Sequence, residues 1–159
     1  MRKLLLISFL LLVSACDSSS SNGLPQPRLL EAEFSVLDKF GVETDQFVVG
    51  EPITFRLTIS NRSVSSITYS AARPNSDVFV QQGTNVIWSY HFGEVFPAIV
   101  DTAIIDAGET VAGTFEWNGT DMQGNQVSPG QYEVIPLLNW WVNDVAVTVL
   151  PATRTIVLQ

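Results

Sequence analysis

The stretch that decides the fold is Ile-Thr-Phe-Arg-Leu-Thr-Ile-Ser, residues 53–60. Its odd-numbered positions are all apolar, and its even-numbered positions are all polar or charged. This alternation has the period of a β-strand with one face in a core and the other toward water. Residues 61–63, Asn-Arg-Ser, are expected to end the strand.

Short runs of β-branched and aromatic residues lie on both sides of this strand and are separated by turn residues. Residues 78–80 and 86–88 predict a hairpin. Arg-Pro-Asn-Ser-Asp at 73–77 predicts a break between strands, and Pro136 is expected to limit strand pairing. No window shows the period of a helix. The chain is therefore predicted to be all-β, an Ig-like β-sandwich of about 7–9 antiparallel strands. Further strands are expected within residues 34–37, 47–49, 67–69, 99–105, 111–117, 132–136, 145–149 and 153–158.

The N-terminus has the pattern of an export signal. Arg2 and Lys3 precede an apolar run from Leu4 to Val13, and small residues lead to Cys16. This order is typical of a secretory signal peptide, and the run is too short to cross a bilayer as a helix. The end of the signal resembles the bacterial lipobox, which implies cleavage before Cys16 and acylation of its thiol.

Three segments are expected from this pattern. Residues 1–15 are predicted to be a lipoprotein signal peptide, residues 16–28 the lipidated cysteine and a flexible linker, and residues 29–159 the sandwich domain. The expected location is the cell envelope, with the domain anchored by palmitate-type lipid. Asp17 resembles an inner-membrane retention signal, which implies the periplasmic face of the inner membrane; otherwise the outer membrane or cell surface is expected. An unlipidated secretory signal is the alternative.

The charge balance excludes some classes of partner. Loss of Arg2 and Lys3 with the signal leaves six basic residues against sixteen acidic ones, a net charge of about −10. Such a surface repels phosphate backbones, so we expect no nucleic-acid partner. Cys16 is the only cysteine, so no intrachain disulfide can support the domain.

The most specific local pattern is W-x-G-x-D-x-x-G-x-x-V-x-P-G-x-Y, residues 117–132. Its glycines suit tight turns, and Asp121 is placed to cap neighbouring amides. Calcium binding by this loop is the less favoured alternative, because the spacing of a calcium loop is absent. Tyr132 is expected to pack its ring in the core while its hydroxyl stays hydrogen-bonded.

These motifs, together with residues 55–61, 87–90 and 105–110, resemble the BsuPI domain, which is named for an intracellular proteinase inhibitor. The resemblance covers roughly Gly50 to Leu138. It implies an Ig-like sandwich and inhibition of serine proteinases of the subtilisin class. The matching residues are turn and core residues, so they indicate the fold better than the activity.

Nothing in the sequence predicts an enzyme. His91 is the only histidine, and its neighbours suggest a surface side chain rather than a general base. The carboxylates of Asp101, Asp106 and Glu109 surround a turn, where solvated acidic residues are expected. We therefore expect no catalytic residue, no metal site and no cofactor.

The candidate binding residues are mostly aromatic: Tyr90, Phe92, Phe96, Asp121, Trp140 and Trp141. Neighbouring Trp140 and Trp141 are expected to point to opposite faces of a strand, so one of them is either an outward anchor for a partner or covered by the terminal strands. A protein partner, such as a serine proteinase, is expected to bind one of the segments 72–77, 90–97 or 120–128. The alternatives are a structural or adhesion module of the envelope and a carbohydrate-binding module.

Overall fold

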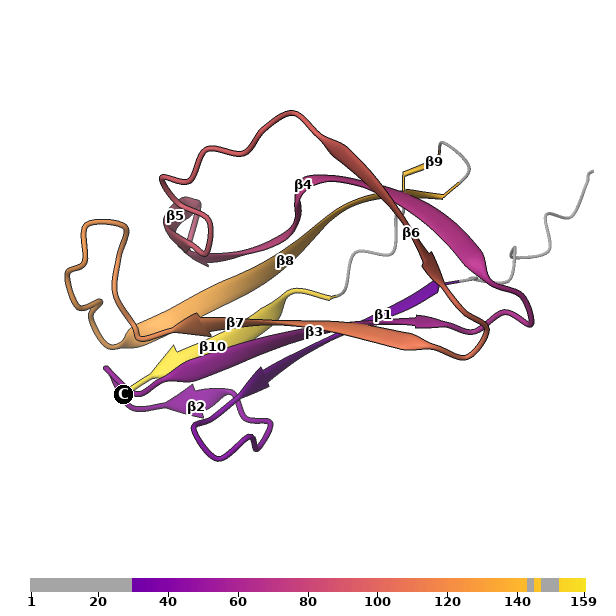
Figure 1. The fold of residues 1–159 in the computed structure, drawn as a ribbon. Helices are drawn as coiled ribbons and strands as arrows, with labels where there is room; N and C mark the ends of the chain where they lie inside the picture. Colours follow the sequence, from indigo (N-terminus) through magenta and orange to yellow (C-terminus); the bar gives the residue numbers. More distant parts are fainter. Residues whose placement is uncertain (1–29, 143–144, 147–151) are drawn as a thin grey trace, which may run out of the picture.

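The computed structural model describes residues 30–142, 145–146 and 152–159, and within them the chain forms ten strands and no helix (Figure 1). Two sheets pack against each other, which confirms the predicted all-β sandwich. The predicted signal peptide, Cys16 and the linker lie outside the described residues. The strands are β1 (Leu30–Leu37), β2 (Gln46–Phe47), β3 (Ile53–Asn61), β4 (Ile67–Gln82), β5 (Asn85–Ser89), β6 (Val100–Ile105), β7 (Thr110–Trp117), β8 (Gly130–Val142), β9 (Val145–Ala146) and β10 (Arg154–Leu158).

The smaller sheet has the order β1-β3-β7, with the strand predicted from residues 53–60 at its centre. The apolar side chains at 53, 55, 57 and 59 are all buried, whereas the alternate residues are partly or fully exposed. β3 is antiparallel to both of its neighbours. The alternation in the sequence therefore correctly predicted both the strand and its buried face.

The larger sheet has the order β2-β10-β8-β4-β5, with β6 also paired to β4 and β9 to β8. Its ladders are antiparallel except that β2 and β10 run parallel, which corrects the expectation of antiparallel strands throughout. After β1 the chain reverses at Asp38–Val42 and crosses to the other sheet. There the short β2 meets β10 from the far end of the sequence, a pairing that no local pattern signals.

Long strands cross two places where the sequence predicted interruptions. β4 continues through residues 73–77, where its ladder with β8 shifts register between Ala71 and Ser76. The side-chain amide of Asn139 donates to the carbonyl oxygen of Pro74 at 2.8 Å, and the amide of Arg73 donates to Ile99. Because neighbouring groups satisfy the polar atoms of the bulge, the strand does not have to end there.

Pro136 does not end β8 either, and it pairs with Val78 of β4. The amide of Val78 donates to the Asp77 carboxylate and its carbonyl accepts from Tyr90, so both groups point away from β8. On the other side of β8, the ladder with β10 ends at Val134. Pro136 therefore occupies a position where no ladder hydrogen bond needs its missing amide proton.

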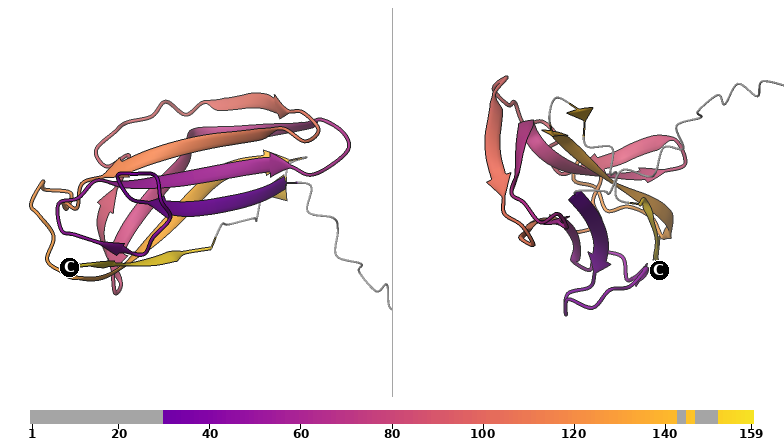
Figure 2. Two further views of the ribbon diagram at one scale, coloured as in Figure 1. Left: turned by 90° about the horizontal axis from the view of Figure 1, so that it is seen from below. Right: turned by 90° about the vertical axis from the view of Figure 1, so that its right-hand side faces the viewer.

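Figure 2 shows the strands of the two sheets from two further sides. The core lies between the sheets and is rich in aromatic rings. Phe55 and Trp117 from the small sheet stack with ring centroids 6.4 Å apart, and Trp88 of β5 packs against both. Tyr132 is buried, and its hydroxyl donates to the carbonyl of Ser128 at 2.6 Å, as predicted. These contacts fix β5, and hence the segment that follows it, against the small sheet.

Candidate binding loop between β5 and β6

The loop from Trp117 to Tyr132 satisfies its own polar groups. One carboxylate oxygen of Asp121 accepts the amides of Gln123 and Asn125, at 2.9 and 2.8 Å. These hydrogen bonds favour the charged form and hold the pKa of Asp121 below its usual range. The geometry matches the predicted capping role, while a role of Asp121 in binding a partner remains a prediction.

The two neighbouring tryptophans point to opposite faces of β8, as expected. Trp140 is buried and stacks on Tyr69 of β4, with ring centroids 4.0 Å apart. It lines a cleft of about 200 Å³ between the sheets, and its Nε1 has no hydrogen-bond partner among the described residues. Trp141 is half-buried. Of the two candidates, only Trp141 therefore offers part of its ring at the surface.

The three aromatic candidates Tyr90, Phe92 and Phe96 lie together in the segment between β5 and β6, which arches over the top of the molecule in Figure 1. Tyr90 begins the segment. Its ring packs edge-on against Phe115 of β7, with centroids 5.0 Å apart, and its amide donates to Val78 of β4. The first residue of the segment is thus attached to both sheets.

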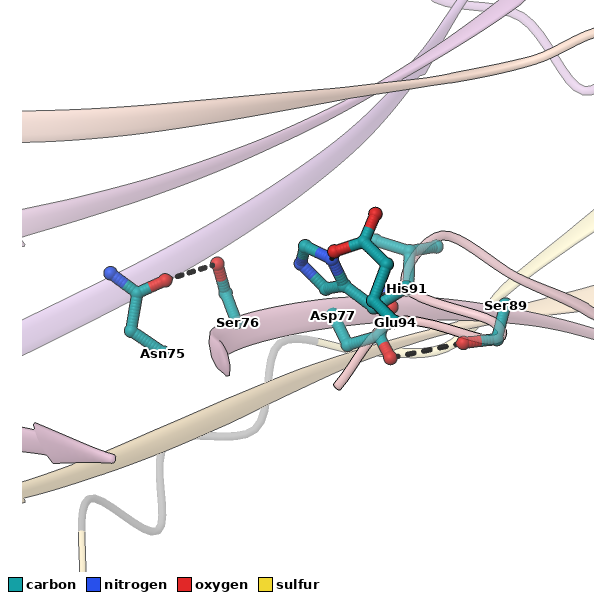
Figure 3. A network of polar contacts seen from close by, with 7 residues as sticks. Asn75, Ser76, Asp77, Ser89, His91 and Glu94 are labelled. Carbon is teal, nitrogen blue, oxygen red and sulfur yellow. Dashed lines mark hydrogen bonds and ion pairs between the residues drawn. The ribbon is translucent and has the colours of Figure 1, made fainter. Parts of the chain in front are cut away.

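A buried polar pair lies at the base of the same segment (Figure 3). The hydroxyl of Ser89 donates to Oδ2 of Asp77 at 3.0 Å, and Oδ1 of Asp77 accepts the amide of Val78 at 2.7 Å. Asp77 and Ser89 are both buried. The sequence alone does not reveal this pair, because Asp77 lies in the segment 73–77, where a break was predicted. The predicted hairpin was the signal that could have found it, since its register places Ser89 opposite Phe79.

His91 is half-buried, which corrects the prediction of a surface side chain. Its Nδ1 lies 3.0 Å from Oε2 of Glu94, the neighbour labelled in Figure 3. Its ring packs edge-on against Tyr90 and Phe96. Ser89 bonds to Asp77 instead of to the imidazole. The arrangement has no nucleophile activated by a base, and its effect is to close the turn at residues 91–94.

Beyond this turn the segment is apolar and unpaired. The side chain of Val95 is 96% exposed, while that of Phe96 is half-buried against His91. Within the turn itself, the side chain of Phe92 is 56% exposed. Among the described residues, no backbone hydrogen bond involves Val95 or Phe96. The segment then re-enters the sheet at Ile99, whose carbonyl accepts the amide of Arg73.

The structure distinguishes the three segments that the sequence offered for partner binding. Residues 72–77 belong to the continuous strand β4, and residues 120–128 form the polar loop that Asp121 caps. Residues 90–97 alone combine exposed apolar side chains with free backbone groups. The loop between β5 and β6, residues 90–99, is therefore the best candidate site and is called the β5–β6 loop below.

The described residues show neither of two other kinds of site. In residues 30–142, 145–146 and 152–159, no three His, Cys, Asp or Glu side chains gather closely enough to hold a metal ion. No helix in the same part of the chain has the length and hydropathy needed to span a bilayer.

A comparison with protein families decides the affiliation. The sequence model of the BsuPI family, described as an intracellular proteinase inhibitor, matches residues 40–140. The chain belongs to the BsuPI family. The BsuPI match extends the resemblance seen in the sequence from residue 50 back to residue 40, and it includes the whole β5–β6 loop.

No curated protein matches the BsuPI chain. Similar solved structures include the alkylpurine DNA glycosylase AlkC of Pseudomonas fluorescens (TM-score 0.45, 14% identity), a CARDB domain from Pyrococcus furiosus (0.47, 12%) and a β-glucosidase of Listeria innocua (0.44, 16%). The alignments cover 82%, 82% and 81% of this chain, respectively. They cover 30% of the glycosylase chain, 87% of the CARDB chain and 16% of the glucosidase chain.

Proposed function

We propose that this chain is a lipid-anchored, non-enzymatic inhibitor of serine proteinases of the subtilisin class, and that the β5–β6 loop binds the enzyme. The family affiliation supports inhibition as the activity. The observation that carries the choice of loop is its combination of an exposed apolar segment with firm attachment at both ends. Such a segment loses little conformational entropy when it enters an active-site cleft.

The experiment is a titration of subtilisin with residues 16–159 carrying Cys16→Ser, which removes the acylation site. Inhibition predicts that proteinase activity falls linearly to near zero as the inhibitor approaches one molar equivalent. Slow digestion of the chain with no loss of enzyme activity would refute the proposal. An inactivated subtilisin with a blocked catalytic serine should still bind the chain if the contact is through the cleft.

The anchor and the location are a separate part of the proposal. The basic start, the short apolar run and Cys16 support lipidation, which would hold the domain in the cell envelope through the linker at residues 16–28. Asp17 favours the periplasmic face of the inner membrane. Cells that produce the full chain with radiolabelled palmitate should give a labelled protein, and Cys16→Ala should abolish the label. A labelled Cys16→Ala protein would refute this assignment.

One observation favours a second candidate, an assembly or adhesion module that pairs through a sheet edge. Among the described strands, β6 pairs only with β4, and its residues are exposed up to Ile104. An open edge of this kind can add a strand from a partner protein. A Thr102→Pro variant should bind less of such a partner in a pull-down experiment. It should leave proteinase inhibition unchanged.

A further inference from the structure

We infer that Val95 is the residue that enters the main specificity pocket of the bound proteinase, with the Val95–Phe96 peptide bond lying where the enzyme cleaves a substrate. This inference rests on the proposed inhibitory function and goes further, because it names one contact residue and one peptide bond. It follows from three properties of the β5–β6 loop: side-chain exposure, backbone pairing and attachment.

Exposure selects Val95 among the apolar residues of the loop. A side chain that fills a specificity pocket must be free before binding, and that of Val95 is 96% exposed. Phe96 is half-buried and packs on the His91 ring, with centroids 4.9 Å apart. Tyr90 is similarly engaged with Phe115. Neither ring can enter a pocket without giving up its contacts within the domain.

Backbone pairing excludes Phe92, the other exposed aromatic residue. The amide of Phe92 donates to Ser89 and the amide of Glu94 donates to His91, so Phe92 lies inside a hydrogen-bonded turn. Proteinases bind substrates as extended strands through main-chain hydrogen bonds, and a closed turn does not fit such a cleft. Val95 and Phe96 have no backbone hydrogen bonds within the described chain, and Pro97 restricts the backbone directly after them.

Attachment on both sides explains why this segment would inhibit instead of being rapidly degraded. Before it, His91 contacts Glu94 at 3.0 Å. After it, Ile99 accepts the amide of Arg73, and Arg73 contacts Asp101 at 2.6 Å. Hydrolysis of the Val95–Phe96 bond by water would give a Val95 carboxylate and a Phe96 amine. Both new ends would stay close to each other, which favours resynthesis of the bond and slows release.

The test changes the specificity of the loop. The pocket of trypsin ends in a carboxylate and selects basic side chains, so Val95→Lys should create inhibition of trypsin. We expect Val95→Lys, in residues 16–159 with Cys16→Ser, to bind trypsin at least ~100-fold more tightly than the parent and subtilisin at least ~30-fold more weakly. Val64→Lys is the matched control, because Val64 is also 96% exposed but lies in the turn between β3 and β4. It should change neither affinity.

The outcomes separate this inference from the proposed function. If the parent inhibits subtilisin and Val95→Lys behaves like Val64→Lys toward both enzymes, the inference is wrong and the proposed function stands. If the parent inhibits no subtilisin-class enzyme, the proposed function fails, and the inference fails with it. Circular dichroism and thermal unfolding of each variant confirm that a lost interaction does not reflect an unfolded domain.

Cleavage mapping gives an independent measurement. After long incubation of the inhibited complex at mildly acidic pH, mass spectrometry should find fragments 16–95 and 96–159. A first cut at any other bond of the β5–β6 loop would overturn the assignment of Val95. Fragments that remain associated during gel filtration would agree with the double attachment of the loop.

Discussion

The buried pair at the base of the β5–β6 loop allows a quantitative prediction. Replacing Asp77 by alanine removes the acceptor of two hydrogen bonds, at 2.7 Å from the Val78 amide and 3.0 Å from the Ser89 hydroxyl. A hydrogen bond to a charged group contributes about 1.5–3 kcal/mol, and both donors would be left without partners in a buried site. Removal of a buried charge offsets part of this loss. We expect Asp77→Ala to lower the free energy of unfolding by about 2–4 kcal/mol.

The assay is equilibrium unfolding in urea, followed by tryptophan fluorescence. With a denaturant slope of about 2 kcal/mol per molar urea, the midpoint should fall by about 1–2 M. Ser89→Ala removes only one of the two hydrogen bonds and should lower the free energy of unfolding by about 1–2 kcal/mol. Because Asp77→Ala already breaks that bond, adding Ser89→Ala to it should lower the free energy of unfolding little further. The effect of the double substitution should therefore be smaller than the sum of the two single effects by about 1 kcal/mol.

Two results would refute this reasoning. One is an Asp77→Ala variant whose free energy of unfolding lies within about 0.5 kcal/mol of the parent, since ordinary surface substitutions fall in that range. The other is strict additivity of the two substitutions, which would show that Asp77 and Ser89 do not act as a pair. A control at Asn75, an exposed residue of the same strand, should change stability by less than about 0.5 kcal/mol.

Three further predictions concern residues outside the loop. Asn61 is fully buried and its side-chain amide donates to Ile105 at 2.9 Å, so Asn61→Ala should lower the free energy of unfolding by about 2–4 kcal/mol in urea titrations. Gly119 has φ +74 and a Cβ there would lie 2.8 Å from Nε2 of Gln126, so Gly119→Ala should lower the thermal midpoint through about 1–3 kcal/mol of strain. Asp121 has a lowered pKa in the folded chain, so its stabilising effect is complete above its unfolded value of about 3.8 and is lost as the pH falls through the folded value. Asp121→Asn should therefore flatten the dependence of stability on pH in acid, and an acid-unfolding curve identical to that of the parent would contradict this.

Local patterns were sufficient for part of the fold. The alternation at residues 53–60 predicted β3 and its buried face, and the apolar runs at residues 78–80 and 86–88 predicted the hairpin of β4 and β5. In these cases the side-chain period and the turn residues act over a few positions, so a single stretch contains all the information. The Tyr132 hydroxyl bond was predictable for the same reason, because its acceptor is only four residues away.

Other features depend on contacts between distant segments. The parallel pairing of Val157 with Gln46 joins opposite ends of the domain. Pro136 is tolerated because of where the neighbouring ladders end, which the sequence around it does not show. For Trp140 and Trp141, alternation predicts opposite faces, but the position of Tyr69 decides which ring is buried.

The sequence predicted which segment forms the candidate site, but not which residues of that segment are exposed or unpaired. The sequence pointed to Tyr90, Phe92 and Phe96 as aromatic residues near a loop, but not to Val95, the most exposed of the large hydrophobic residues in that loop. Valine gives no chemical signal in a sequence, because it is common in every strand. Only the exposure of the side chain and the absence of backbone pairing distinguish it.

The separate positions of β5 and β6 along β4 explain why such a loop exists. β5 and β6 lie on the same edge of β4: β5 pairs with residues 79–82 and β6 with residues 67–72. Between these two ladders, residues 73–78 of β4 have no strand partner on this edge, while on the opposite edge the ladder with β8 shifts between Ala71 and Ser76. The chain therefore leaves the edge of β4 after Tyr90 bonds to Val78 and returns when Ile99 bonds to Arg73. The result is a segment that is unpaired in the middle and hydrogen-bonded at both ends. A proteinase cleft could supply the strand pairing that this segment lacks.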